Sequence, residues 1–395
     1  MNERSLVLNK LTGPVLIALV SLGCGGGRGR VEKTTENGVE VVLNRAGGRP
    51  GKASPVLTLE KFFDVDTEDD TTAALGVTDI YNFEVDPAGN ILILVPPTGP
   101  RNCIYKLSPE GKLLVSFGLI GQGPNEMRYP EEVLALDNGE IWVLESPKNK
   151  IHIFDAGGKP VAERSPVKFE TITPLANGNH LVTRLDAADL TQRYLPMTID
   201  LYDAQFGLIK ELDRSTRYAN RTIYQKVPEP YVSGTGLIFQ AKASRDRIYV
   251  GNSDRGYEIL VLDLDGRLIR KVRREYAPVP VTDEYKKKYL KNFLEFMPDF
   301  AEKIYFAEYW HPFHAFFPDE AGRLFVMTYE PGERPGEFIY DIFNKDGALI
   351  ARAGINALHS RNGALKARVR GDRLYAVEEK PNGFKQLVVY RMTWR

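Results

Sequence analysis

Apolar and polar residues alternate along most of the chain, in short runs that are separated by turn-forming residues. The stretch FEVDPAGNILIL (Phe83–Leu94) is one example, and VLALDNGEIWVL (Val133–Leu144) is another. Each predicts a strand, a tight turn rich in Asp, Asn and Gly, and a second strand of alternating pattern. The pattern recurs in Ile172–Val182 and Ala315–Val326 and, more weakly, in Phe239–Val250 and Leu365–Val377. We therefore expect a fold built from repeated β-hairpins.

A second hairpin follows each of the first five copies, counted along the chain. Its versions are IYKLSPEGKLLVSF, IHIFDAGGKPV, IDLYDAQFGLI, ILVLDLDGRLI and DIFNKDGALI, and the sixth copy, QLVVYRMTWR, contributes a single strand. Repeats of ~40–50 residues with four strands each predict an all-β fold, a six-bladed β-propeller of four-stranded antiparallel blades. The stretch Val56–Val65 precedes the first unit and can supply the missing outer strand, which closes the ring and removes an open edge.

The glycine-rich stretch GLIGQG (Gly118–Gly123) raises the alternative of a nucleotide site. A phosphate-binding loop follows a strand and opens a helix. This stretch instead leads into the strand EEVLALD. We therefore interpret it as a connection between two blades and expect no nucleotide there.

The residues that follow carry a more specific likeness. The stretch GQGPNEMRYPEEVLALDNGEIWVLESPKNKIHIFDAGGK (Gly121–Lys159) resembles an NHL repeat, with its glycine-rich loop, its proline before the inner strand and its aromatic strand. Most of the chain from residue 36 on resembles secreted, bacterial NHL/TolB-like six-bladed propeller lipoproteins, and ENGVEVVLN (Glu36–Asn44) resembles their leader. The resemblance implies the propeller fold and an exported location, and for the lipoprotein members it implies no settled activity.

The first 24 residues predict an export signal. Arg4 and Lys10 precede the apolar run Leu11–Gly23, which is shorter than the ~20 residues that a membrane-spanning helix needs. The run ends in Ser21-Leu22-Gly23-Cys24, which resembles a bacterial lipobox with its Leu and small residue exchanged. We expect lipidation of Cys24 and anchoring in the cell envelope, and the alternative is a plain secretory signal. Residues 25–55 then predict a flexible tether with one short β-like piece, and residues 56–395 form the propeller.

Acidic and basic residues balance, with 52 of each and a formal net charge of zero. Proteins that bind nucleic acid usually carry a basic excess, so we expect no nucleic-acid partner. Cys24 and Cys103 are the only cysteines, which excludes a disulfide framework and a multi-cysteine zinc site. For Cys103 we expect a buried thiol rather than a nucleophile.

The predicted loops differ between the two faces of the propeller. The turns within each hairpin are tight and lie on one face, the tight-turn face. All long connections fall on the other, the long-loop face: 119–131, 184–196, 210–235, 270–314 and 329–337. Binding residues concentrate on long loops over a rigid scaffold, so we place the ligand site at the axial mouth of this face. The predicted ligand-binding residues are Arg101, Asn102, Gln122, Asn125, Glu126, Tyr129, Glu131, Arg255, His311 and His314.

The longest connection, between blades four and five, predicts a helix. Thr282 is placed to cap its start and Pro298 to stop it. Tyr285, Tyr289, Phe293 and Met297 repeat every four residues and form one apolar stripe. We expect the stripe to pack on the propeller, and the alternative is a lid or a partner-binding helix.

The sequence does not supply a complete catalytic or metal-binding set. His311 and His314 are the one close pair among five histidines, and no third ligand stands nearby. We therefore predict a non-catalytic binding scaffold for a glycan, peptide or protein, with no cofactor and no metal. The alternative is a propeller enzyme with its site in the central funnel, a lyase or a metal-dependent lactonase-like hydrolase in which Glu126 and Asn125 would serve as ligands.

Overall fold

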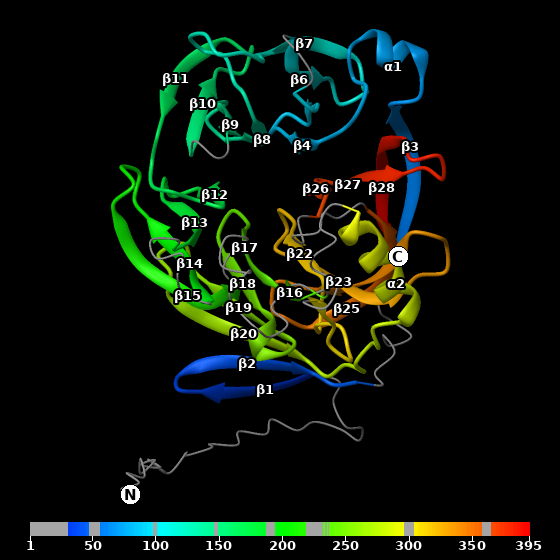
Figure 1. Cartoon of the computed structure of the whole chain (residues 1–395). Coiled ribbons are helices and arrows are strands. Elements are labelled where there is room, and N and C mark those ends of the chain that lie inside the picture. The colour runs from blue at the N-terminus through cyan, green and yellow to red at the C-terminus, as the bar shows by residue number, and fades with distance from the viewer. Residues whose placement is uncertain are drawn as a thin grey trace, which may run out of the picture.

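The computed structural model shows six sheets arranged in a ring, each with the four antiparallel strands of one blade, which is the six-bladed β-propeller that the repeats predict (Figure 1). It describes residues 31–46, 56–97, 101–145, 149–186, 194–218, 232–233, 235, 237–295, 304–357 and 365–395. Cys24 and the predicted export signal lie outside these residues. The core lies between neighbouring blades, where the apolar faces of adjacent sheets pack on each other.

Blades one to three follow each other directly along the chain, and each runs from an inner to an outer strand. Blade one holds β4 (Asn82–Val85), β5 (Ile91–Leu94), β6 (Asn102–Leu107) and β7 (Leu113–Leu119). Blade two holds β8 (Pro130–Ala135), β9 (Ile141–Glu145), β10 (Lys150–Phe154) and β11 (Pro160–Arg164). Blade three holds β12 (Thr171–Pro174), β13 (His180–Leu185), β14 (Tyr194–Tyr202) and β15 (Leu208–Tyr218).

Blades four to six complete the ring. Blade four holds β17 (Phe239–Ala243), β18 (Ile248–Asn252), β19 (Glu258–Leu262) and β20 (Leu268–Arg274). Blade five holds β22 (Ala315–Pro318), β23 (Leu324–Pro331), β24 (Glu337–Phe343) and β25 (Leu349–Asn356). Blade six holds β26 (Ala367–Arg370), β27 (Arg373–Glu379), β28 (Lys385–Trp394) and β3 (Leu57–Asp66).

The two ends of the propeller region meet in blade six, as predicted. β3 pairs antiparallel with β28 over its full length, from Leu57 opposite Trp394 to Asp66 opposite Gln386. Beyond the strands, the Val56 amide donates to the Arg395 carbonyl oxygen at 2.7 Å, and the Arg395 amide donates back at 3.1 Å. The ring is thus closed by main-chain hydrogen bonds between segments more than 300 residues apart.

Short aspartate- or asparagine-led turns build the tight-turn face. In blade one, the Asp86 carboxylate accepts from the amides of Ala88 (2.9 Å) and Asn90 (2.8 Å). Asp155, in the outer hairpin of blade two, accepts at 2.9 Å from the amides two and four residues on. Equivalent bonds occur at Asp203, Asp263 and Asn344. These side chains satisfy turn amides locally, which keeps the connections short and rigid.

Residues 31–46 depart from the predicted tether. They form the hairpin β1 (Val31–Glu36) and β2 (Val39–Asn44), and β2 pairs in parallel with the outer strand β20 of blade four (Figure 1). Val41 and Val42 are buried, and the Asn44 side chain bonds the main chain of blades four and five. The β-like piece is therefore part of a six-stranded sheet. The expected β-like piece is therefore present, and it belongs to a longer hairpin that burial and strand pairing hold on blade four.

The insertion between blades four and five contains the expected helix, α2 (Asp283–Leu294). Thr282 caps it, with its hydroxyl oxygen accepting from the Tyr285 amide at 3.2 Å. Met297, the last member of the predicted stripe, lies outside the described residues. The described residues also contain the short helix α1 (Asp70–Ala74), the turn η2 (Ser253–Arg255), and the strand β16 (Val232–Ser233) in parallel with β21 (Ile304–Tyr305). No described helix is long and apolar enough to cross a membrane.

Candidate functional site

Every exposed tyrosine in the described part of the chain lies on the long-loop face. Tyr81 (40% exposed) precedes β4, Tyr129 (57%) precedes β8, and Tyr305 (38%) and Tyr309 (45%) lie between β20 and β22. All four thus belong to connections that lead into an inner strand. An exposed tyrosine offers a flat apolar ring and a hydroxyl, a combination that suits sugar rings and peptide groups.

Charged side chains from the inner strands of four blades gather at the axis. Arg368 of β26 donates from Nε to Glu84 Oε2 of β4 at 3.0 Å. Glu132 of β8 and Lys242 of β17 are close enough for the charge of each to shift the pKa of the other. The charge of Glu84 also acts to raise the pKa of Lys242. Blades one and four stand opposite each other in the ring, so the side chains of Glu84 and Lys242 approach each other across the axis. We call these four residues the axial charge cluster.

Partial burial shifts the proton affinities within this cluster. Burial raises the pKa of Glu132, against the opposing influence of the positive charges on Lys242 and Arg368. Burial also lowers the pKa of Lys242. It acts in the same sense on Arg368, but Glu84 and Glu132 outweigh it and raise the pKa of that guanidinium. Two acids and two bases in one place can donate to and accept from a polar ligand, and they also hold four blades together.

A second group of polar side chains surrounds Tyr81, three residues before Glu84 on the long-loop side. Lys366 donates from Nζ to the Ile80 carbonyl oxygen at 3.3 Å and lies 5.7 Å from the centre of the Tyr81 ring. The main-chain oxygen of Glu131 accepts from Asn82 Nδ2 at 3.3 Å. Burial and the charge of Glu131 together raise the pKa of Tyr81. Tyr81, Glu131 and Lys366 therefore form one group, which we call the mouth cluster.

The lysine of the mouth cluster has an unusual proton affinity. Burial lowers the pKa of Lys366 to about 8, with Lys385 adding to the effect and Asp79 opposing it. Lys385 itself is paired with Asp79 at 2.7 Å, so Asp79 gives Lys366 only partial compensation. A fraction of Lys366 is therefore uncharged near neutral pH, when its amine can accept as well as donate a hydrogen bond.

The glycine-rich loop before blade two is filled by a side chain of its own. Glu126 Oε2 accepts from the Gly123 amide at 2.7 Å. A Cβ atom on Gly121 would lie 2.0 Å from the same oxygen, so a side chain at this position would displace the Glu126 carboxylate. This hydrogen bond gives Glu126 a structural role in the loop.

Other predicted site residues in blade one and the following loop are held by nearby groups. Asn102 donates to the carbonyl oxygen and hydroxyl of Ser116 at 3.0 and 3.1 Å, within its own blade. Gln122 accepts from the guanidinium of Arg128. Arg101 lies 3.4 Å from the Thr78 hydroxyl, and Asn125 is exposed in a left-handed backbone conformation (φ 59°). Of the predicted set, Tyr129 is one of the exposed tyrosines and Glu131 belongs to the mouth cluster.

Arg255 lies apart from the axis. Its Nη1 atom bonds both carboxylate oxygens of Asp213 at 2.8 Å, and its Nε lies 3.4 Å from Glu258. Asp213 belongs to β15, the outer strand of blade three, so this network joins two neighbouring blades. The structure does not bring Arg255 together with the other predicted ligand-binding residues.

His311 and His314 lie beneath the helical insertion. Both are half-buried, and the His314 ring lies 5.0 Å from that of Tyr329. Tyr329 stacks on Trp310 at 4.5 Å, and Trp310 meets Tyr285 of α2 edge to face at 4.5 Å. The apolar stripe of α2 therefore packs toward blade five through Trp310, in agreement with the packing interpretation.

The remaining chemical candidates are inert or incomplete in the part of the chain that is described. Cys103 is buried, its thiol donates to the Gly118 carbonyl oxygen at 3.0 Å, and burial raises its pKa to about 12. It is therefore a packing residue at neutral pH. Within the described ranges, no three His, Cys, Asp or Glu side chains are grouped as metal ligands.

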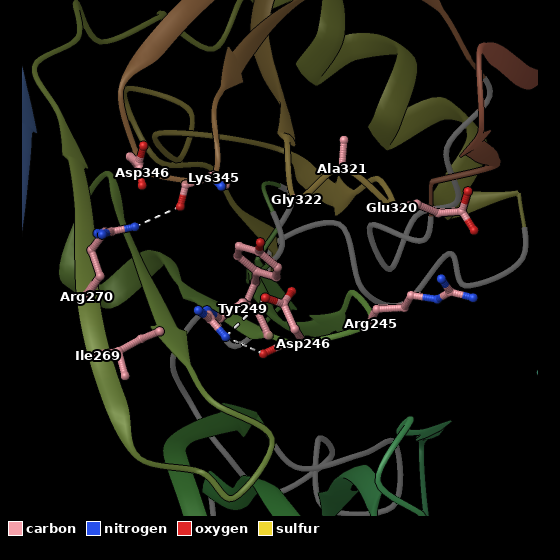
Figure 2. A pocket seen from close by; sticks show the side chains of 11 residues that line it. Arg245, Asp246, Tyr249, Ile269, Arg270, Glu320, Ala321, Gly322, Lys345 and Asp346 are labelled. Carbon is pink, nitrogen blue, oxygen red and sulfur yellow. Dashed lines mark hydrogen bonds and ion pairs between the residues drawn. The ribbon is translucent and has the colours of Figure 1, made fainter.

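The tight-turn face carries a pocket that the sequence did not predict. It lies between blades four and five and has a volume of about 390 Å³. Figure 2 shows Arg270, Lys345 and Asp346 on one side, Glu320 and Arg245 on the other, and Tyr249 between them. The loop asymmetry pointed to the opposite face and gave no reason to look here.

The axial charge cluster was also missed, although the sequence contains a signal for it. Three of its four members stand between apolar residues of a predicted inner strand, as in FEV around Glu84, AKA around Lys242 and ARV around Arg368. A charge within an inner strand has to face the axis or a charged partner, because burial without a partner is costly. What the sequence could not show is that the four charges meet, since that depends on how the blades close into a ring.

No family model and no curated protein matches the chain. Among solved structures it is similar to a candidate exported protein from Bacteroides fragilis NCTC 9343, at 13% identity and a TM-score of 0.47, over 89% of this chain and 99% of that one. A DUF4221 member from Bacteroides vulgatus gives 12% and 0.48, over 87% and 99%. A streptogramin B lyase gives 10% and 0.36, over 87% and 98%. The six blades of the structure, and not these similarities, therefore assign the chain to the six-bladed β-propellers.

Proposed function

We propose that the protein is a non-catalytic binding protein of the bacterial cell envelope, which holds a polar ligand at the long-loop mouth of the propeller axis. The ligand class that fits is an envelope glycan or an extended peptide, the latter free or part of a protein partner. The observation that carries the proposal is the restriction of exposed tyrosines to this one face, above the axial charge cluster.

The mouth of the long-loop face combines aromatic rings with charged groups. Tyr81 and Tyr129 each precede a member of the axial charge cluster by three residues, so ring surfaces and charged groups follow each other along the same strands. A sugar or peptide that lies on the rings can direct its polar groups toward Glu131 and Lys366. The tight turns at the other end of the axis offer no comparable aromatic surface among the described residues.

A binding screen with matched variants tests the site. The mature protein is screened against envelope glycans and peptides, and each hit is titrated with Tyr129→Ala and Glu131→Gln. We expect each change to weaken binding by roughly three- to tenfold, as the loss of one ring contact or charged hydrogen bond implies. Leu208→Ala serves as control, because Leu208 is equally exposed (58%) on the outer strand of blade three. A hit that survives both site changes, or that is lost with the control, contradicts this location.

We also propose export of the chain and lipid anchoring at Cys24. The support is the positively charged start, the short apolar run and the Gly23–Cys24 junction of the sequence. Several acyl chains on one residue anchor firmly, because each buried CH₂ contributes ~0.8 kcal/mol. Cys24→Ser is expected to move the protein from the membrane to the soluble fraction, and a variant that stays with the membrane would show that the anchor lies elsewhere.

A further inference from the structure

The pocket between blades four and five is formed by rigid elements of the tight-turn face. Its walls are the inner hairpin turn of blade four, the strand β20 and two turns of blade five. The buried ring of Tyr249 and the side chain of Ile269 provide apolar surface, and charged groups surround it (Figure 2). The volume of about 390 Å³ suits a small molecule or the end of a chain rather than a protein surface.

Gly322 keeps one wall of the pocket open. Its backbone is in the left-handed region (φ 75°), and a Cβ atom there would lie 3.2 Å from the Lys345 Cβ and 4.0 Å from the Tyr249 hydroxyl. A side chain at this position would therefore enter the space between the two turns of blade five and Tyr249. The glycine fits the turn and leaves the pocket accessible.

Most of the charges around the pocket already have partners. Arg247 Nη1 bonds the carbonyl oxygen of Asp246 at 2.7 Å and its carboxylate at 3.2 Å. The Glu320 carboxylate accepts from Arg370 at 2.7 Å. These acids are satisfied, so they do not compete strongly for a further cation in the pocket.

Arg270 is held from two sides. Its Nε lies 2.5 Å from Glu40 of the N-terminal hairpin, and its Nη1 donates to the Lys345 carbonyl oxygen at 2.7 Å. The N-terminal hairpin thus fixes one wall of the pocket and joins it to the outer hairpin turn of blade five. This wall is organised before any ligand arrives, which lowers the entropic cost of binding.

Two cations remain without an acidic partner. Arg245 and Lys345 are exposed, and among the described residues neither side chain makes a hydrogen bond or ion pair. Asp346 is the one acid of the lining whose side chain also has no ion-pair partner among the described residues. Two unpaired cations and one unpaired acid give the pocket a surplus of one positive charge. A ligand with a single negative group would restore the balance.

We propose that this pocket is a second binding site, which takes a small ligand with one carboxylate or phosphate group on a compact apolar body. The anionic group lies between Arg245 and Lys345, and the apolar body contacts Tyr249 and Ile269. This site is on the face opposite to the mouth cluster, so it does not depend on the function proposed above.

Benzoate, its neutral analogue benzamide, and phenyl phosphate test the proposal by calorimetric titration of the mature protein. We expect saturable binding of benzoate or phenyl phosphate and clearly weaker binding of benzamide. Arg245→Gln and Lys345→Gln are each expected to weaken binding of the anion by about three- to tenfold, as the loss of one exposed charged contact implies. Both residues are exposed, so the variants are expected to keep the melting temperature of the wild-type protein.

Lys159→Gln is the matched control, since Lys159 is an exposed lysine in the corresponding outer hairpin turn of blade two. It should leave anion binding unchanged. Equal binding of benzoate and benzamide, an equal loss with Lys159→Gln, or no saturable binding of either anion in the millimolar range would each overturn the proposal. A preference for benzoate over phenyl phosphate, or the reverse, identifies which anionic group the site takes.

Discussion

Replacement of Asp341 by alanine tests how strongly buried charges join blades four and five. Asp341 of β24 is fully buried, and its carboxylate accepts from the Tyr257 hydroxyl at 2.6 Å and from Arg352 Nε at 2.9 Å. It also pairs with Arg274, whose side chain is 10% exposed. Asp341→Ala leaves the Arg274 guanidinium and the Tyr257 hydroxyl without this acceptor in a buried place, where each needs one.

The expected loss follows from the cost of breaking a buried ion pair. Removal of one partner typically costs about 3–5 kcal/mol. A propeller of this length unfolds with an entropy of roughly 0.7 kcal/mol/K, at ~2.1 cal/mol/K per residue, so Tm should fall by about 4–7 °C. Thermal unfolding followed by circular dichroism measures the change. Asp341→Asn, which keeps an acceptor but loses the charge, is expected to lie between alanine and wild type.

Asp137→Ala is the control for these measurements, because Asp137 is an exposed aspartate in the inner hairpin turn of blade two. Its Tm should stay within about 1 °C of the wild-type value, as is usual for exposed positions. If the Tm of Asp341→Ala also stays within about 1 °C of the wild-type value, the Asp341 carboxylate does not stabilise its buried partners. The account of how blades four and five are joined would then be wrong.

Three further predictions concern single side chains. Gly121→Ala should displace the Glu126 carboxylate from the Gly123 amide and cost about 1–2 kcal/mol in urea unfolding, and it should cost much less in a Glu126→Ala background. Cys103 should resist a thiol reagent at pH 8 in the folded protein and react fully in denaturant, whereas fast labelling of the native state would contradict its burial. The pKa of Lys366 is lowered to about 8 by folding, so the unfolded chain binds more protons between pH 8 and about 10.5. Wild-type stability should therefore rise with pH across that window relative to Lys366→Met, and parallel pH profiles would refute the shift.

The fold could be predicted from the sequence because each blade is a local pattern. Alternating residues define the strands, and residues such as Asp86 and Asp155 bond the amides of their own turns, so neither depends on distant parts of the chain. The closure by β3 was also predictable, since the last unit lacked one strand. The hairpin of β1 and β2 was not, because its partner β20 lies more than 200 residues away and pairs with it in parallel.

The candidate site was less predictable for the same reason. The long connections indicate a face, and Tyr129 and Glu131 were found because they precede an inner strand. Glu126 was selected by its loop position, but its carboxylate is taken by the Gly123 amide. Arg255 was selected in the same way and proved to bond Asp213 of the neighbouring blade. Whether a polar side chain is available to a ligand depends on neighbours that the sequence does not place beside it.

The pairing of β3 with β28 also sets the order in which the protein can be completed. β3 is among the first propeller segments to be synthesised, and its partner, which ends at Trp394, is among the last. Until that final strand is made, β3 has an unsatisfied edge and the other five blades form an open arc. A chain that folds during synthesis or export must therefore keep β3 unpaired until β28 has been made.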